Sequence, residues 1–215
     1  MARSAAAVVT VPAMPVRVNT DLLAMQPGRV VGLEGSTGSG LTRVGFSMLA
    51  GTPHPHRVVV DARGWICPLS AWEVGIPPDG LTVVRCDDPA RWPRAVATLL
   101  DGVKAIYAEV PGGIRDSVLR RLGAKTRTRD AMVILRPLAG RLPPGLAYLR
   151  VQVAQVVWEG AGRGHGRLDR RTLILELSGK GAAGRRVVVE VEDDGAHPVR
   201  MVSGLGAPQA GRAAG

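Results

Sequence analysis

The chain has 215 residues, which fits one sizeable domain with short extensions better than two complete domains. The absence of any run of about 18 uninterrupted apolar residues excludes a membrane-spanning segment from our expectations, and two cysteines, Cys67 and Cys86, exclude a disulfide framework and indicate reduced thiols. A formal net charge of +10 favours a polyanionic partner such as nucleic acid, the alternative being a basic protein without such a partner.

The two ends of the sequence differ in composition from the part between them. Residues 1–27 are expected to form a partly extended N-terminal arm, whose apolar run is broken by Pro12 and Pro15 and is too weak for a signal peptide. Residues 196–215 are rich in Ala, Gly and Pro and are expected to form a flexible C-terminal tail. A single core domain is therefore expected over residues 28–195.

The first part of this core alternates short apolar runs with amphipathic stretches. Strands are predicted over residues 29–33, 57–61, 81–85, 104–110 and 131–135, and helices from residue 41 and over residues 68–74, 89–100 and 114–125. Strands separated by helices at this spacing indicate βαβ units and a parallel sheet.

The pattern changes from residue 146 onward. Three strand-like runs follow, over residues 146–158, 171–177 and 186–192, with no helix between them. The segments that join them are rich in Gly, which is typical of hairpin turns. The predicted fold class is therefore α/β, with a mostly parallel sheet flanked by helices and an antiparallel extension at its C-terminal end.

A glycine-rich segment between the first strand and the first helix carries the main chemical signal. It matches the phosphate-loop pattern G-x-x-x-x-G-K-[ST] at every fixed position except one, where Leu41 replaces the Lys. The candidate nucleotide-binding residues are Gly35, Ser36, Thr37, Gly38, Ser39, Gly40, Leu41 and Thr42. In such a loop the Lys neutralises phosphate oxygens and the Thr hydroxyl binds Mg²⁺. The alternative is a glycine-rich turn with no nucleotide history.

The order of several motifs resembles the core of the RecA recombinase family over about three-quarters of the chain. Besides the phosphate loop, the matching segments are VVVDAR at 58–63, LLDGVKAIYAEV at 99–110, and the strands LAYLRVQV, RTLILELSGKG and RRVVVEVEDDG. The RecA relatives that it resembles most are the ImuA-type proteins, which accompany damage-induced error-prone polymerases in the actinobacterial mutasome.

The departures from the RecA pattern imply a loss of catalysis. Arg63 stands where the family has the Glu that activates the attacking water, and Arg cannot act as that base. Glu109 stands where the family has the Asp of the magnesium site, and a Glu at this position can still bind a metal ion. With Leu41 in place of the Lys, the resemblance implies a vestigial site, no catalytic residues, and at most weak binding of ATP and Mg²⁺. Lys180 matches a basic position that in RecA contacts the nucleotide of a neighbouring subunit.

Basic residues concentrate between residues 111 and 150, where nine basic side chains face two acidic ones. The resemblance places two DNA-binding loops here, at residues 111–121 and 136–150. The candidate DNA-binding residues are Arg115, Arg120, Arg121, Lys125, Arg127, Arg129, Arg136 and Arg141. Only Tyr148 is available for base stacking, so salt-sensitive, sequence-independent binding is expected. The alternative is a solvated helix face.

Other conspicuous residues favour structural roles. His54 and His56 lack a third ligand at a workable spacing, so no metal site is expected. The four tryptophans, Trp65, Trp72, Trp92 and Trp158, are expected to pack in the core and at the sheet edges rather than to form a stacking platform.

The resemblance implies a non-catalytic accessory protein in DNA-damage-induced translesion synthesis. The expected partners are an ImuB-type Y-family-like adaptor, an error-prone DnaE-type polymerase, RecA and single-stranded DNA, at a cytoplasmic, nucleoid-associated location away from membranes. One alternative is a divergent DNA-dependent ATPase that uses Lys180 or Lys104. A second alternative is a SulA-like inhibitor of cell division.

Overall fold

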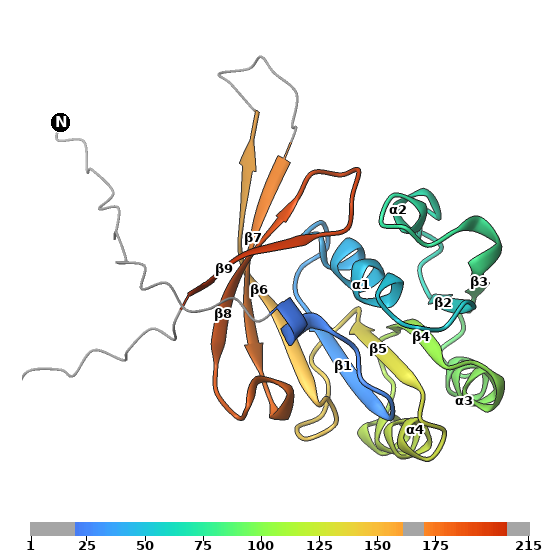
Figure 1. The fold of residues 1–215 in the computed structure, drawn as a ribbon. Coiled ribbons are helices and arrows are strands. Elements are labelled where there is room, and N and C mark those ends of the chain that lie inside the picture. The colour runs from blue at the N-terminus through green and yellow to red at the C-terminus, as the bar shows by residue number, and fades with distance from the viewer. Residues whose placement is uncertain (1–19, 161–169, 206–215) are drawn as a thin grey trace, which may run out of the picture.

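A computed structural model describes residues 20–160 and 170–205 of the chain as one nine-stranded sheet with helices on both faces (Figure 1). The strands are β1 (Arg29–Glu34), β2 (Arg57–Asp61), β3 (Leu81–Arg85), β4 (Ala105–Val110), β5 (Met132–Pro137), β6 (Leu149–Glu159), β7 (Arg170–Ser178), β8 (Val187–Asp193) and β9 (Arg200–Leu205). The helices are α1 (Leu41–Ala50), α2 (Leu69–Trp72), α3 (Trp92–Gly102) and α4 (Asp116–Thr128), with 3₁₀ turns η1 (Thr20–Leu23), η2 (Pro78–Gly80) and η3 (Lys180–Ala182).

The strand order confirms the predicted fold class. The sheet runs β3-β2-β4-β5-β1-β6-β7-β8-β9, with parallel pairing from β3 to β6 and antiparallel pairing from β6 to β9. The central strands β4 and β5 are buried along nearly their whole length, as expected for parallel strands that are covered on both faces. Among the described residues, no helix has both the length and the apolar character that crossing a membrane requires.

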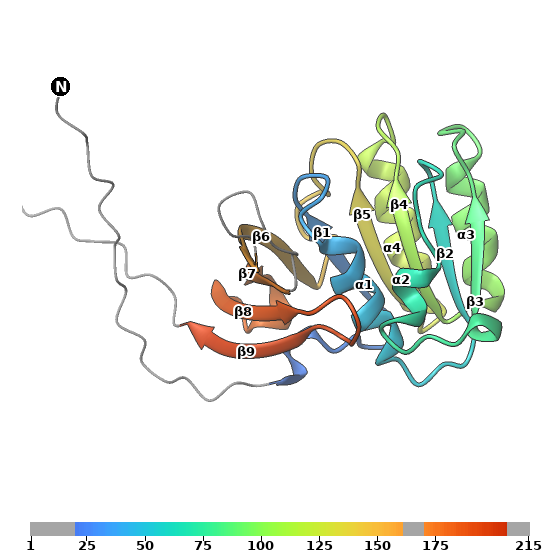
Figure 2. The same cartoon turned by 90° about the horizontal axis from the view of Figure 1, so that it is seen from above.

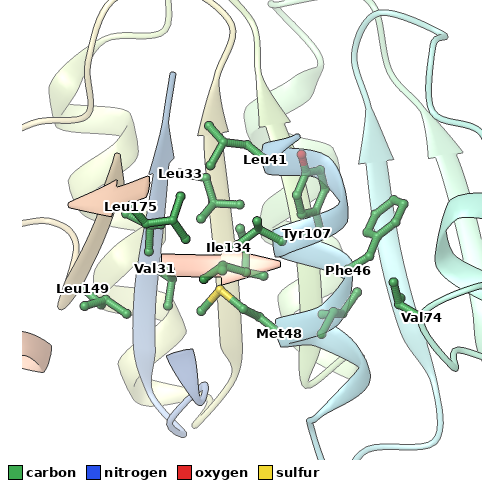
Figure 3. Close-up of a cluster of buried hydrophobic side chains, with 14 of the residues drawn as sticks. Val31, Leu33, Leu41, Phe46, Met48, Val74, Tyr107, Ile134, Leu149 and Leu175 are labelled. Atoms are coloured by element: carbon green, nitrogen blue, oxygen red, sulfur yellow. The ribbon is translucent and has the colours of Figure 1, made fainter. Parts of the chain in front are cut away.

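Helices cover both faces of the parallel half of the sheet, with α1 and α2 on one face and α3 and α4 on the other (Figure 2), and one apolar cluster holds the helices to each face. On one face α1 packs through Leu41, Phe46 and Leu49, and the Phe46 ring meets Tyr107 of β4 edge-to-face at 5.3 Å between centroids (Figure 3). The same cluster continues beneath the antiparallel strands. On the other face α3 and α4 contribute residues such as Leu100 and Leu122. The α1 cluster therefore joins both halves of the sheet into one core.

Both predicted extensions contribute to the folded domain. Leu22, Leu23 and Met25 pack against the α1 cluster, so the predicted arm is attached to the core from about η1 onward. The tail predicted to be flexible from residue 196 instead forms β9, which pairs antiparallel with β8. Met201 packs against the core there, which gives the strand an apolar anchor. The rest of the predicted arm and tail, residues 1–19 and 206–215, lies outside the described residues.

One arginine closes the C-terminal end of α1. The Arg57 guanidinium donates hydrogen bonds to the carbonyl oxygens of Leu49 (3.0 Å), Ala50 (3.1 Å), Thr52 (3.0 Å) and Pro55 (3.2 Å). The Ala50 carbonyl oxygen at the end of α1 thereby gains a partner that the helix itself does not supply, and the Leu49 oxygen, which also accepts from the Thr52 backbone N–H and hydroxyl, gains a further donor. Partial burial lowers the pKa of Arg57, which stays charged at neutral pH.

Replacing Arg57 by methionine should therefore lower the free energy of unfolding by about 2 kcal/mol, because four hydrogen bonds from a charged donor are lost while the aliphatic stem is kept. Urea unfolding followed by circular dichroism measures this. Arg85→Met on β3 is the control, since Arg85 is exposed and no side-chain hydrogen bond is seen for it in the described part of the chain. Equal stability of the two variants would contradict a capping role.

Candidate functional site

The degenerate phosphate loop lies between β1 and α1, as the sequence predicted. Gly38 and Gly40 adopt the left-handed conformation, with φ of 81° and 85°, which a side chain would disfavour. The Ser39 hydroxyl donates to the Ser36 carbonyl oxygen at 2.6 Å and closes the loop on itself. The loop leaves β1 at the edge of the sheet where the parallel strands β2, β4 and β5 also have their carboxyl ends.

Leu41 does not point toward solvent from this loop. Its side chain is fully buried and belongs to the α1 cluster, next to Leu33 (Figure 3). One of its methyl carbons lies 2.9 Å from the position that a Cβ atom on Gly35 would take, so Leu41 fills the space beneath the loop. The position of the phosphate-binding lysine is therefore a core position in this chain.

Thr42, the expected magnesium ligand, is engaged by an arginine. Arg136 on β5 donates a hydrogen bond to the Thr42 hydroxyl and lies 3.4 Å from the Tyr107 hydroxyl. Burial raises the pKa of Tyr107, so this phenol stays protonated. Arg136 itself is buried. Arg136, one of the predicted DNA-binding residues, is therefore not exposed, and its guanidinium is directed to Thr42 and Tyr107 beside the loop.

Glu109, the expected magnesium-site carboxylate, is also fully engaged. It is completely buried, and its Oε1 accepts hydrogen bonds from the Arg63 guanidinium, including one from Nε at 3.1 Å. Its Oε2 accepts from the backbone N–H groups of Ala62 (3.3 Å) and Arg63 (3.4 Å). The hydrogen bond to Glu109 raises the pKa of Arg63. A guanidinium thus balances the carboxylate charge that a metal ion would otherwise balance.

A second set of ion pairs, centred on Asp193, fixes the antiparallel strands to α1 and the loop. Asp193 on β8 is buried and accepts hydrogen bonds from Arg43 Nε (2.9 Å) and Arg171 Nε (2.7 Å). The Arg171 guanidinium covers Gly40, where an added Cβ would lie 2.9 Å from its central carbon. Arg43 also pairs with Glu73 at 2.5 Å. These partners were not predicted, because the residues are far apart in the sequence and no motif joins them.

The comparison with known families gives one match. A family described as MT3502 N-terminal domain matches residues 21–141, which is more than half of the chain. The chain belongs to this family. The match covers β1 to β5 with the loop, Thr42, Arg63, Glu109 and Arg136, and it ends before β6. No curated protein matches the chain.

Exposed apolar side chains lie on the loop that follows β2 and on α2, the short helix after it, within the part of the chain that matches the MT3502 N-terminal domain. The buried Asp61 carboxylate accepts hydrogen bonds from the backbone N–H groups of residues 63–66, with nitrogen–oxygen distances of 2.7 to 3.3 Å. These bonds fix the loop that carries Trp65. Trp65 is 70% exposed, and Leu69 and Trp72 of α2 are 51% and 45% exposed. We call Trp65, Leu69 and Trp72 the tryptophan patch.

The expectation for the tryptophans is therefore correct for only one of the four. Trp92 is fully buried between α3 and the sheet, whereas Trp158 on β6 is 47% exposed, with the Arg171 guanidinium over its ring. Trp65 likewise carries the Arg63 guanidinium at 5.0 Å from its ring centroid. Since large apolar side chains are seldom left in water without a partner, the tryptophan patch is a candidate interaction surface.

The predicted DNA-binding residues make different contacts, although most of them lie on α4 or at its ends. Lys125 and Arg129 both bind Asp101, at 2.8 and 2.7 Å, and their hydrogen bonds lower the pKa of that carboxyl group. Arg120 donates to the Pro144 carbonyl oxygen at 3.2 Å. Arg115, just before the first residue of α4, and Arg121, inside the helix, are both exposed. Only Arg127 and Arg141 line the same cleft, which also contains Lys180.

The structure gives no support for a metal centre within residues 20–160 and 170–205. No group of three or more His, Cys, Asp or Glu side chains is arranged there to hold a metal ion. His54 and His56, which the sequence left without a third ligand, lie in the loop before β2.

Proposed function

We propose that this chain is a RecA-like accessory protein of the ImuA type, which does not hydrolyse ATP and acts as a scaffold in DNA-damage-induced translesion synthesis. The observation that carries the proposal is that the chain's own side chains occupy the nucleotide site. Leu41 fills the space beneath the loop, Arg136 holds Thr42, and Arg63 holds Glu109.

The energetics of these contacts oppose nucleotide binding. A metal–nucleotide complex needs the Thr42 hydroxyl and a free carboxylate, and both are already bonded to arginines. Separating the buried Glu109 from Arg63 would cost about 3 kcal/mol, which is roughly a 100-fold loss of affinity. No lysine stands at position 41, and the two arginines beside the loop are already bonded, Arg136 to Thr42 and Arg171 to Asp193, so the backbone N–H groups would be the main unbonded donors to a phosphate.

The tryptophan patch supports the scaffold part of the proposal. Exposed tryptophans are typical anchors of protein interfaces, where each one contributes a large apolar area at a small entropic cost. The patch lies beside the occupied site, joined to it through Arg63, which contacts both Trp65 and Glu109. We propose that it binds an ImuB-type Y-family-like adaptor. Through that adaptor the chain would reach the error-prone DnaE-type polymerase, with RecA and single-stranded DNA as further partners.

The nucleotide site is tested by titrating the purified protein with Mg²⁺ and ATP and by following phosphate release, with and without single-stranded DNA. We expect a Kd weaker than about 1 mM and no turnover above the buffer rate, since binding must first break the Arg63–Glu109 ion pair. Thr42→Ala is the matched control and should leave both readouts unchanged. Turnover that disappears in Thr42→Ala would overturn the proposal and establish a divergent ATPase.

A further inference from the structure

A cleft of about 940 Å³ lies on the sheet face opposite α1. Its walls come from α4, the start of β1, the segment 141–148 before β6, and the η3 turn between β7 and β8. Arg150 and Gln152 of β6 line it, while their neighbours Leu149 and Val151 point into the α1 cluster on the other face. The cleft is therefore separate from the occupied nucleotide site.

The cleft carries an excess of positive charge. Arg150 and Arg141 share the single carboxylate of Glu34, the second at 3.6 Å, and Arg186 pairs with Glu176 at 3.5 Å, so these paired groups still leave one positive charge in excess. Three further basic side chains line the cleft and form no ion pair with any described residue: Arg29, Arg127 and Lys180. Against them stands one carboxylate without an ion pair in that part of the chain, Asp116, at the start of α4.

An aromatic ring lies under one of these cations. Tyr148, which is partly buried, lies on the cleft wall with the Arg29 guanidinium over its ring at 5.0 Å from the centroid. A guanidinium stacked on an aromatic ring presents a flat cationic surface, on which a nucleic-acid base can stack. The cleft thus combines separate cations for phosphate groups with one stacking position for a base.

We propose that this cleft binds single-stranded nucleic acid. The cations come from three elements, β1, α4 and η3, an arrangement expected for contacts to successive phosphate groups of a sugar–phosphate backbone. The net charge of +10 adds long-range attraction for a polyanion. An acidic peptide would use the same charges but would gain nothing from the stacked Arg29 and Tyr148.

The test measures the anisotropy of a labelled oligothymidylate of about 15 nucleotides across roughly 50 to 200 mM salt. The variant is Arg127→Ala with Lys180→Ala, and the matched control is Arg85→Ala with Arg94→Ala. Arg85 and Arg94 are exposed on β3 and α3, form no ion pair with any described residue, and lie outside the cleft. Each pair removes two positive charges and little buried surface, so both proteins should fold normally.

The cleft variant should bind at least about 10-fold more weakly, and the slope of log K against log salt should fall by about 0.7 for each cation removed. The control should stay within about twofold of the unchanged protein. Equal losses in the two variants, or no loss in either, would overturn the proposal. Displacement of the oligonucleotide by polyglutamate at equal charge would overturn it in favour of an acidic protein partner. ATP turnover would contradict the proposed function without affecting this site, whereas failure here would remove single-stranded DNA from the proposed partners and leave the non-catalytic scaffold role intact.

Discussion

Replacing Arg63 by alanine is expected to lower the free energy of unfolding by about 3 kcal/mol. Glu109 is completely buried, and Arg63 is its partner ion, so the substitution leaves a carboxylate without a counter-charge in the core. The backbone N–H groups of Ala62 and residue 63 would remain bonded to Oε2, which keeps the loss at the lower end of the range for a broken buried pair. Urea unfolding at neutral pH measures the change.

Two further variants separate the buried pair from a general effect of losing an arginine. Adding Glu109→Gln to Arg63→Ala should recover part of the loss, because a neutral amide is less costly to bury than a carboxylate. Arg91→Ala removes an exposed ion pair with Asp88 and should cost less than about 0.5 kcal/mol. If Arg63→Ala destabilised the protein no more than Arg91→Ala, the Arg63–Glu109 pair would not provide the stability that its burial implies.

The parallel half of the fold could be predicted from the sequence because its signals are local. Buried runs such as AIYAEV and MVILRP are flanked by helices with apolar spacing, and this alternation is enough to give βαβ units. The antiparallel half was also predicted, since three strand-like runs without helices between them leave hairpins as the simplest connection. Element boundaries moved by a few residues, as at α3, which begins at Trp92 rather than residue 89.

The segments that were misjudged depend on contacts with distant parts of the chain. β9 forms because its backbone pairs with the edge of β8 and because Met201 packs against the core. Neither contact can be predicted from the local sequence of a Gly- and Ala-rich stretch. Leu22 and Leu23 likewise pack on a surface that forms only when the sheet is complete. Short strands and turns gain most of their stability from tertiary packing, so local composition is a poor guide to them.

The occupied site was half predictable. The loop and the missing lysine follow from spacing, but the role of Arg136 was missed because its segment was assigned to a basic loop. Strand periodicity contained the signal: side chains alternate between faces, so Arg136 lies on the same face as Ile134, which packs under α1. The tryptophan patch was missed for a different reason. The exposure of Trp65 depends on the conformation of the loop that Asp61 holds, and that conformation has no periodic signal in the sequence.

Replacing Trp65 and Trp72 together by alanine is expected to weaken binding of the proposed ImuB-type adaptor by at least about 100-fold, since buried interface tryptophans commonly contribute about 2 kcal/mol or more each. The free energy of unfolding should fall by no more than about 3 kcal/mol and the protein should still fold, because Trp65 is 70% exposed and only Trp72, which is 45% exposed, loses a substantial buried area. Calorimetric titration of the adaptor into each variant gives the affinity, and urea unfolding gives the stability.

Trp158→Ala is the matched control for the tryptophan patch. Trp158 is 47% exposed and, like Trp65, has an arginine over its ring. It lies on β6 in the antiparallel half of the sheet, whereas Trp65 and Trp72 lie in the segment that connects β2 to β3 in the parallel half; Figure 1 labels these strands. Its loss should leave adaptor affinity within about twofold, because an interface concentrates its binding energy in a few neighbouring residues. An adaptor that binds all three proteins equally well would show that the exposed tryptophans are not its docking surface, whereas loss of binding only in Trp158→Ala would move that surface to the antiparallel strands.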